Sequence, residues 1–260
     1  MGDLVRVEDR DSVRVLTVTR PEKLNALNAS VLEELSAALV RAEADAGLRC
    51  VIVTGAGEKS FIAGADIAEL AKLSPLEGRE HARRGQAIFD RLSGLPVPTI
   101  AAINGFAYGG GLELAMACTL RVASENARMG LPETSLGILP GYGGSQRLAR
   151  LVGRARALEL VLTAEKGLTA AEAERIGLIN RVVPEGQALS GALEIAKKIG
   201  ANGPVACRYA MEAIRRGLDM PLAEGQLLEA TLFGLCAATA DMQEGMTAFL
   251  EKRPARFSGR

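Results

Sequence analysis

The chain has 260 residues, which is enough for one large domain or for a core with an appendage. Lysine plus arginine and aspartate plus glutamate are both 31, so the net charge is zero and no basic field attracts nucleic acid or an anionic membrane. Aromatic residues make up only 3% and tryptophan is absent, which leaves little surface for stacking on single-stranded bases.

The four cysteines are widely separated and mostly have apolar neighbours, as is typical of buried free thiols in a reducing compartment. No pair of them has the spacing of zinc ligands. His81 is the only histidine, so neither a histidine-rich metal site nor a Ser-His-Asp triad is available in its usual form. We find no signal-peptide pattern and no apolar run of membrane-spanning length, and we therefore expect a cytoplasmic protein without a metal.

The first half of the chain alternates expected strands with helices and loops. Apolar and polar residues alternate where strands have one solvated face, whereas wholly apolar segments are typical of strands covered on both faces. In chain order we expect a hairpin (4–8 and 13–19), a helix from about 28 to 46 capped by Asn28 or Ser30, a buried strand (50–54), a loop (55–66), an amphipathic helix (76–92) and a buried strand (97–103). His81 lies between charged residues of that second helix, which favours a solvated position.

The second half is expected to become helical after two further short strands, at residues 120–123 and 127–130. Beyond Pro140 the pattern predicts helices only, at 143–151, 155–163, 170–176, 188–199, 204–216, 223–235 and 241–252. The alternation of strands and helices over residues 50–130 indicates α/β architecture. A helical C-terminal part is expected to cap an active site, to contact other subunits, or to do both.

The stretch around the three consecutive glycines Gly109, Gly110 and Gly111 carries the strongest chemical signal. An apolar strand runs through an Asn-Gly turn into these glycines, which open an apolar helix. The first turn of a helix has N–H groups without intrahelical partners, so it suits a developing oxyanion, and Gly110 is the candidate donor. Glu113 lies three residues further on the same helical face, as a general base would. The alternative is a glycine-rich connection in which the glutamate complements the helix dipole.

Glu133 is the second candidate carboxylate. It follows Pro132, which suits the first turn of a short helix. Two carboxylates that face one pocket could hold a water molecule and exchange a proton in turn. Spacing alone, however, favours a surface position for Glu133.

Four motifs together closely resemble those of the enoyl-CoA hydratase, or crotonase, family. They occupy residues 61–66, 103–113, 131–133 and 137–147, and the resemblance extends from residue 20 to residue 253. It implies a crotonase-like α/β fold, a spiral of ββα units over residues 1–195. It also implies a C-terminal helical region, residues 196–260, for active-site capping and trimerisation.

The resemblance further implies roles for individual residues. The N–H groups of Ala65 and Gly110 would form an oxyanion hole for a thioester carbonyl. Glu113 and Glu133 would hold a water molecule, one activating its oxygen for attack at the β-carbon while Glu133 exchanges the proton at the α-carbon. Positions that match substrate and coenzyme A contacts are Lys23, Leu24, Ala63, Asp66, Ile67, Gly109, Pro132, Gly141 and Tyr142. No cofactor is expected, because coenzyme A arrives as part of the substrate.

Retention of both carboxylates favours reversible hydration of a trans-2-enoyl-CoA to a 3-hydroxyacyl-CoA, in fatty-acid or related degradation. Pocket depth would depend on residues 70–86 and on Tyr108, Leu112 and Tyr142. The family also implies a homotrimer or a dimer of trimers, that is, a homohexamer.

Alternative functions are a 3-hydroxybutyryl-CoA dehydratase, an enoyl-CoA isomerase, and a non-catalytic acyl-CoA-binding or RNA-binding protein. Basic residues near the C-terminus support the last of these, although they could equally be solvated or meet coenzyme A phosphates. Gly167 is an apparent insertion relative to the family pattern.

Overall fold

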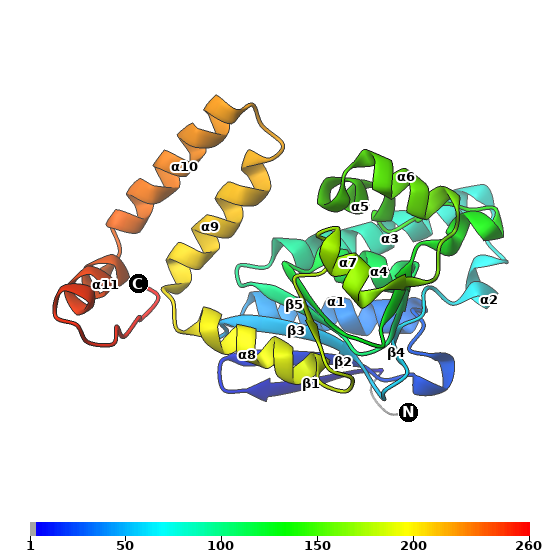
Figure 1. Ribbon diagram of the computed structural model, residues 1–260, viewed down its shortest axis with the longest axis horizontal. Helices are drawn as coiled ribbons and strands as arrows, with labels where there is room; N and C mark the ends of the chain where they lie inside the picture. The colour runs from blue at the N-terminus through cyan, green and yellow to red at the C-terminus, as the bar shows by residue number, and fades with distance from the viewer. Residues whose placement is uncertain (1–3) are drawn as a thin grey trace.

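The computed structural model describes residues 4–260 and contains two β-sheets surrounded by helices (Figure 1). The larger sheet comprises β1 (Val5–Arg10), β2 (Val13–Val18), β3 (Cys50–Gly55), β5 (Thr99–Ile103), β7 (Leu120–Ser124) and β10 (Arg181–Val183), in the order β1-β2-β3-β5-β7-β10. β1 and β2 form the expected antiparallel hairpin, whereas the remaining neighbours are parallel. The predicted α/β class is thereby confirmed.

The smaller sheet comprises β4 (Ser60–Ile62), β6 (Phe106–Tyr108), β8 (Arg128–Gly130) and β9 (Leu168–Thr169). β4, β6 and β8 are parallel, and β9 is antiparallel to β8. The pairs β3–β4, β5–β6 and β7–β8 each place their first strand in the larger sheet and their second in the smaller one. Each pair is followed by a helix, so the chain advances as the predicted spiral of ββα units.

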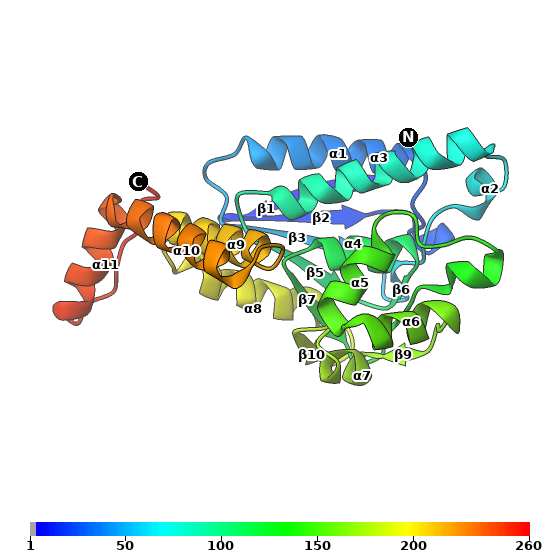
Figure 2. The ribbon, with the colours of Figure 1, turned by 90° about the horizontal axis from the view of Figure 1, so that it is seen from above.

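Helices cover both faces of the larger sheet at its central strands, which explains why β3 and β5 are mostly apolar and fully buried. α1 (Ala29–Glu43) and α3 (Pro75–Gly94) lie on one side and α8 (Ala188–Gly200) on the other (Figure 2). Alternate residues of β3 enter two separate apolar clusters, with Val51 and Val53 beside α1 and α3, and Cys50 and Ile52 beside α8. The prediction of a strand covered on both faces at residues 50–54 is therefore confirmed.

The helices α1, α3 and α4 begin at a polar capping residue or at glycine. Asn28 caps α1, as one of the two candidates, by accepting a hydrogen bond from Val31 N. Ser74 caps α3 in a reciprocal arrangement with Glu77. α4 (Gly110–Ala117) opens at the expected glycine, and all of its residues are buried, which accounts for its apolar composition. Two short 3-10 helices, η1 (Pro21–Lys23) and η2 (Pro132–Leu136), and the short α2 (Ile67–Leu70) lie in the connections.

The remaining helices are α5 (Gly144–Val152), α6 (Arg154–Leu162), α7 (Ala170–Arg175), α9 (Pro204–Gly217), α10 (Leu222–Ala237) and α11 (Ala240–Leu250). α9, α10 and α11 form an arm that extends away from the two sheets (Figure 1). α9 buries none of its side chains and α10 buries only Leu232. The expected boundary at residue 195 falls within α8 and stays a prediction.

Two sequence-based expectations are wrong. Residues 55–66 are not a loop throughout, since they contain β4, and the part beyond Pro140 is not exclusively helical, since it contains β9 and β10. These strands have two or three residues, too few to show an alternating pattern, and they exist because neighbouring strands supply their hydrogen-bond partners. Such pairing is set by the tertiary fold and not by local sequence.

All four cysteines are free thiols; Cys50 and Cys118 are buried, and Cys207 and Cys236 are partly buried. Burial raises the pKa of the Cys50 thiol to about 12, so this thiol is held in its neutral form.

Within residues 4–260, no helix combines the length and the apolar character that crossing a bilayer requires.

Candidate active site

A cavity of about 990 Å³ lies where the four sequence motifs meet. Its lining comes from the loop after β4, from α2 and α3, from the N-terminal turn of α4, and from η2 and the loop that precedes α5. Ala65, Gly110, Glu113 and Glu133 all contribute to this lining. The fold therefore brings together four residues that are spread over almost 70 positions of the sequence.

Glu113 projects from the first turn of α4 and is only 2% exposed. Its Oε1 atom accepts hydrogen bonds from Tyr142 N at 2.8 Å and from Gly144 N at 2.7 Å. A β-carbon at Gly144 would lie 2.8 Å from the same oxygen, so only glycine lets the loop approach the carboxylate this closely. One oxygen of Glu113 is thus anchored by main-chain donors.

Glu133 lies in the first turn of η2, directly after Pro132, as its sequence context predicts. The interpretation as a surface charge is wrong, since its Oε2 atom is buried and has no hydrogen-bond partner among residues 4–260. A β-carbon at Gly109 would lie 2.7 Å from Glu133 Oε1. Gly109 has φ 49° and ψ −124°, a conformation that favours glycine. The glycine therefore lets the carboxylate lie against the mouth of α4.

The two carboxylates influence each other's ionisation. Burial raises the pKa of Glu113 to about 7, and the charge of Glu133 adds to the shift, while the Gly144 and Tyr142 amides oppose it. Burial also raises the pKa of Glu133 to about 6. Whichever carboxylate ionises first raises the pKa of the other. The repulsion between the two charges therefore acts on both groups and cannot be assigned to one of them. Near neutral pH the site is thus suited to keep one proton between two acids.

Ala65 and Gly110, the two residues expected to form the oxyanion hole, both line the cavity. Gly110 is the first residue of α4, where an N–H has no intrahelical acceptor. Ala65 pairs with Leu27 in an isolated parallel bridge. In this bridge Leu27 N donates to Gly64 O and Asp66 N donates to Leu27 O, so the Ala65 N–H takes no part in it. Within residues 4–260, neither amide has a hydrogen-bond acceptor. Two unpaired donors therefore border the same space as the two carboxylates.

The structure separates the residues expected to contact coenzyme A into two groups. Those that line the cavity are Ala63, Ile67, Gly109, Pro132, Gly141 and Tyr142. Lys23, Leu24 and Asp66 lie outside this lining. Lys23 is exposed, and Leu24 O accepts a hydrogen bond from Ala63 N at 3.1 Å. Asp66 caps α2 and forms an ion pair with Arg20 at 3.4 Å, so its side chain is engaged in the fold.

The expectation that His81 is a solvated surface residue is wrong. His81 is half-buried on the α3 side of the cavity, and its Nε2 atom shares a hydrogen bond with Tyr142 Oη. Burial lowers the pKa of His81, so the imidazole is neutral near pH 7. The local sequence gives no signal for this contact, because the partners are separated by 61 positions.

The expected contribution of residues 70–86 and of Tyr108 and Tyr142 to the cavity wall is confirmed. Leu112 is buried but does not belong to the lining. Sequence reasoning missed Gln146 and Lys166, which also border the cavity. Lys166 comes from the loop that contains Gly167, and no pattern in that loop distinguishes it from a solvated lysine.

Comparison with known proteins gives one consistent result. A family model described as enoyl-CoA hydratase/isomerase matches residues 8–260. A short-chain-enoyl-CoA hydratase of Clostridium acetobutylicum is 48% identical over 249 residues, covering 96% of this chain and 95% of that protein. A crotonyl-CoA hydratase of Syntrophomonas wolfei is 46% identical over 251 residues, covering 96% of each. A crystal structure of enoyl-CoA hydratase from Bacillus anthracis has a TM-score of 0.95 and 41% identity, with 99% of this chain and 100% of that one covered.

Proposed function

The chain belongs to the enoyl-CoA hydratase/isomerase family, and we propose that it is a hydratase that adds water reversibly to short-chain trans-2-enoyl-CoA thioesters. The observation that carries this proposal is the pair of carboxylates, the buried Glu113 and the half-buried Glu133, beside two unpaired amides in one cavity. The names of the two relatives, which refer to short-chain and crotonyl thioesters, support the choice of substrate.

In this proposal the amides of Ala65 and Gly110 receive the thioester oxygen. Attack of water at the β-carbon moves electron density onto that oxygen and produces an enolate-like species. An N–H donor that is fixed in advance stabilises such a charge by about 2.7–4 kcal/mol when water is excluded. The positive end of the α4 dipole acts in the same direction on the Gly110 side.

The two carboxylates divide the proton transfers. A water molecule between them loses a proton to Glu113 as its oxygen bonds to the β-carbon, and protonated Glu133 delivers a proton to the α-carbon. The double bond becomes a single bond, and the thioester carbonyl is restored when the α-carbon is protonated. Transfer of one proton from Glu113 back to Glu133 resets the pair, so the net change is addition of one water molecule.

Burial raises the pKa of Glu113 to about 7 and that of Glu133 to about 6, so in the free site the shared proton lies on Glu113. The division of roles requires that proton to lie on Glu133 when the thioester is bound, and the hydrogen bonds favour this arrangement. Two main-chain N–H donors favour the ionised form of Glu113, as a base requires. The unpartnered, buried Oε2 of Glu133 favours the protonated form, as an acid requires. No cofactor is assigned, because coenzyme A enters as part of the substrate, and the cytoplasmic location stays a prediction.

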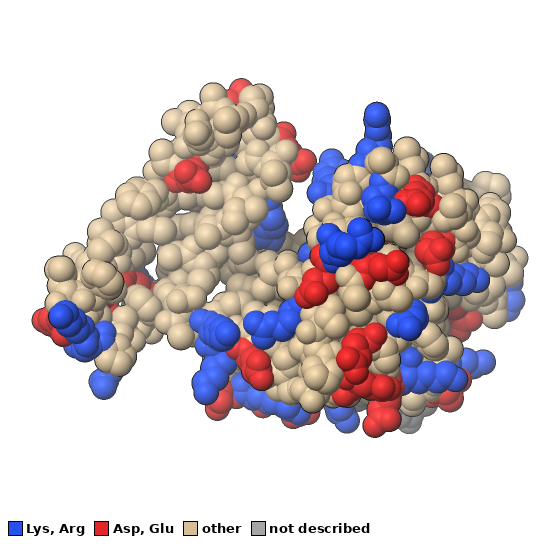
Figure 3. All heavy atoms as spheres, in the orientation of Figure 1, with Lys and Arg blue, Asp and Glu red and all other residues tan. Residues whose placement is uncertain are grey.

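We further propose that the chain assembles as a homotrimer or a dimer of trimers through the arm formed by α9, α10 and α11. Large apolar side chains of the arm face solvent, including Leu218 and Phe249, each 82% exposed. Figure 3 shows that much of the arm carries neither positive nor negative side chains. An apolar surface of this kind is characteristic of a face that contacts another subunit.

The direct test of the reaction is to add crotonyl-CoA to the purified protein and to follow the loss of conjugated enoyl-thioester absorbance. We expect absorbance to fall and 3-hydroxybutyryl-CoA to form, with slower turnover for longer acyl chains. A 3-enoyl-CoA serves as the comparison substrate. Conversion of that compound to a 2-enoyl-CoA without hydration of crotonyl-CoA would identify an isomerase and reject the proposed reaction.

A further inference from the structure

We propose that α3 positions Glu113 for catalysis through the loop at residues 140–144, with His81 and Gln86 as positioning residues. Within residues 4–260, neither side chain forms a hydrogen bond with Glu113. Both bond to the loop whose amides hold it. This inference rests on the proposed function, in which Glu113 is the base.

The ring of Tyr142 lies along one stripe of α3. Residues 81, 85 and 89 are four positions apart and therefore share one face of the helix. His81 bonds to the Tyr142 hydroxyl, and Phe89 packs edge-on against its ring with centroids 5.4 Å apart. Gly85 supplies the space between them, since a β-carbon there would lie 2.1 Å from Tyr142 Cδ1. The stripe thus determines where the ring lies and which way its hydroxyl points.

A neighbouring stripe of α3 holds the main chain of the same loop. Gln86 Nε2 donates to Gly141 O at 2.9 Å. Four residues further on, Asp90 accepts from Arg147 Nη2 at 2.6 Å, and Arg147 Nη1 donates to Tyr142 O at 3.0 Å. The carbonyl groups on both sides of the Tyr142 N–H are therefore anchored, directly or through Arg147, to the helix.

This anchoring controls the hydrogen bonds to the carboxylate. Tyr142 N and Gly144 N both donate to Glu113 Oε1, so a shift of the loop changes both contacts together. A misplacement of about 1 Å at a reacting group can reduce the rate roughly 100-fold. Weaker donation also disfavours the ionised form of Glu113.

Four other charged groups act on the ionisation of Glu113 and His81. Glu113 is influenced by Glu133 from η2 and by Arg147 from α5. His81 is influenced by Glu69 from α2 and by Arg84 on its own helix. None of these four groups is altered in the variants that test the inference.

The test compares His81→Phe and Gln86→Leu with the parent enzyme in crotonyl-CoA hydration over a pH series. Each variant is expected to lower kcat about 10-fold or more and to change KM by a smaller factor, because the loop holds the reacting carboxylate and contributes only part of the cavity lining. The acidic limb of the kcat profile is expected to move to higher pH. A loss of folded protein alone would lower the amplitude of the profile without moving its limb.

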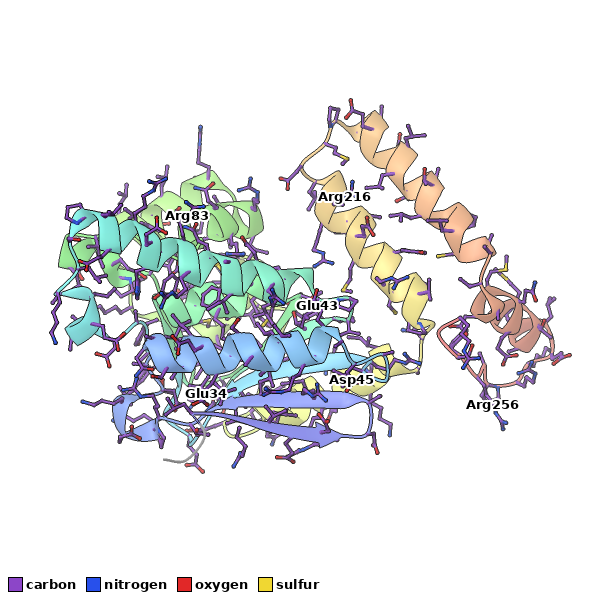
Figure 4. The ribbon with its side chains drawn as sticks, turned by 180° about the vertical axis from the view of Figure 1, so that it is seen from behind. Glu34, Glu43, Asp45, Arg83, Arg216 and Arg256 are labelled. Carbon is purple, nitrogen blue, oxygen red and sulfur yellow. The ribbon has the colours of Figure 1, made fainter. Side chains whose placement is uncertain are left out.

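Three further variants make the test specific. His81→Gln supplies an amide that can bond to the Tyr142 hydroxyl and is expected to restore most of kcat. Tyr142→Phe removes the same bond from the other side, so combining it with His81→Phe is expected to cost little more than either change alone. Arg83→Gln, on the same helix (Figure 4) and exposed, serves as the matched control.

A substrate-free measurement separates this inference from the proposed reaction. Carboxyl ¹³C NMR of glutamate-labelled protein, with Glu113→Gln used to assign the signal, follows the ionisation of Glu113 directly. A higher pKa of Glu113 in His81→Phe and Gln86→Leu supports positioning by α3 whichever thioester is the substrate. An unchanged titration of Glu113 together with a kcat equal to that of Arg83→Gln would overturn the positioning role of α3. A parent enzyme that is inactive on crotonyl-CoA would reject only the proposed function.

Discussion

Glu113 illustrates how a buried acid couples stability to pH. Its pKa is raised from 4.5 to about 7, so between these values the folded protein binds more protons than the unfolded chain. The contribution of this group to stability is therefore fully present below pH 4.5 and is lost as the pH rises through 7. The sign is opposite to that of an ion-paired surface carboxylate.

Replacing Glu113 by Gln removes this ionisation, so the variant is expected to gain stability relative to the parent as the pH rises. The difference in the free energy of unfolding should increase by about 2 kcal/mol between pH 5 and pH 8. Urea denaturation at both pH values measures it, and Glu80→Gln, an exposed position on α3, is the control. A difference that stays constant or falls with pH would contradict the raised pKa.

Gly109 tests the close approach of Glu133 to α4. Gly109→Ala introduces a β-carbon 2.7 Å from Glu133 Oε1 and also strains a backbone that favours glycine. We expect kcat for crotonyl-CoA hydration to fall about 100-fold or more. Gly186→Ala, which has a positive φ but open space around the added carbon, reports on strain alone. Equal activity of the two variants would show that the displacement of Glu133 does not matter.

At the level of single residues, the family motifs predict that Glu113 and Glu133 line one cavity. Their spacing along the sequence alone does not predict it. Helix geometry suggested that Glu113 shares a face with Gly110, but the burial of Glu133 could not be inferred from its position after Pro132. The charged neighbours of His81 along the chain predict a solvated position for it. Its partner, Tyr142, approaches through the tertiary fold, which leaves no periodic signal in the sequence.

At the level of elements, long helices and buried strands were predictable and short strands were not. α1 and α3 repeat apolar residues at helical spacing over several turns, and β3 is apolar throughout. β4 and β6 have three residues each and pair only because the spiral brings them side by side. The close packing of α4 against β4 could be inferred only in general terms, from the run of glycines.

Gly111 tests that packing. A β-carbon at Gly111 would lie 2.0 Å from Ile62 O, a main-chain atom that cannot move independently of β4. Gly111→Ala is therefore expected to lower the free energy of unfolding by about 1–3 kcal/mol. Gly78→Ala, in α3 with nothing within 4 Å, is expected to raise it by up to about 1 kcal/mol through helix propensity. Urea denaturation compares them, and changes of the same sign would contradict the packing argument.

At the scale of the whole molecule, the sheets and the helices packed on them bury two apolar clusters, whereas the arm leaves much of its apolar surface in solvent. The charge balance of 31 to 31 offers no long-range attraction to a charged partner. Together these features favour contact of the arm with another copy of the chain.

Phe233 of α10, which is 73% exposed, tests this assembly. Phe233→Glu places charge on the proposed contact face and is expected to shift the trimer or hexamer towards monomer in light scattering. Val40→Glu, at an exposed apolar position on α1, is expected to leave the assembly unchanged. A parent protein that is monomeric at working concentration would reject the assembly without bearing on the chemistry.

The central claim is that Glu113 and Glu133 act on one water molecule. The most direct measurement is kcat for crotonyl-CoA hydration in Glu113→Gln and Glu133→Gln, together with the affinity of each variant for the thioester. We predict that each substitution lowers kcat about 100- to 10,000-fold while the thioester still binds. Turnover that is unchanged in either variant would contradict the claim.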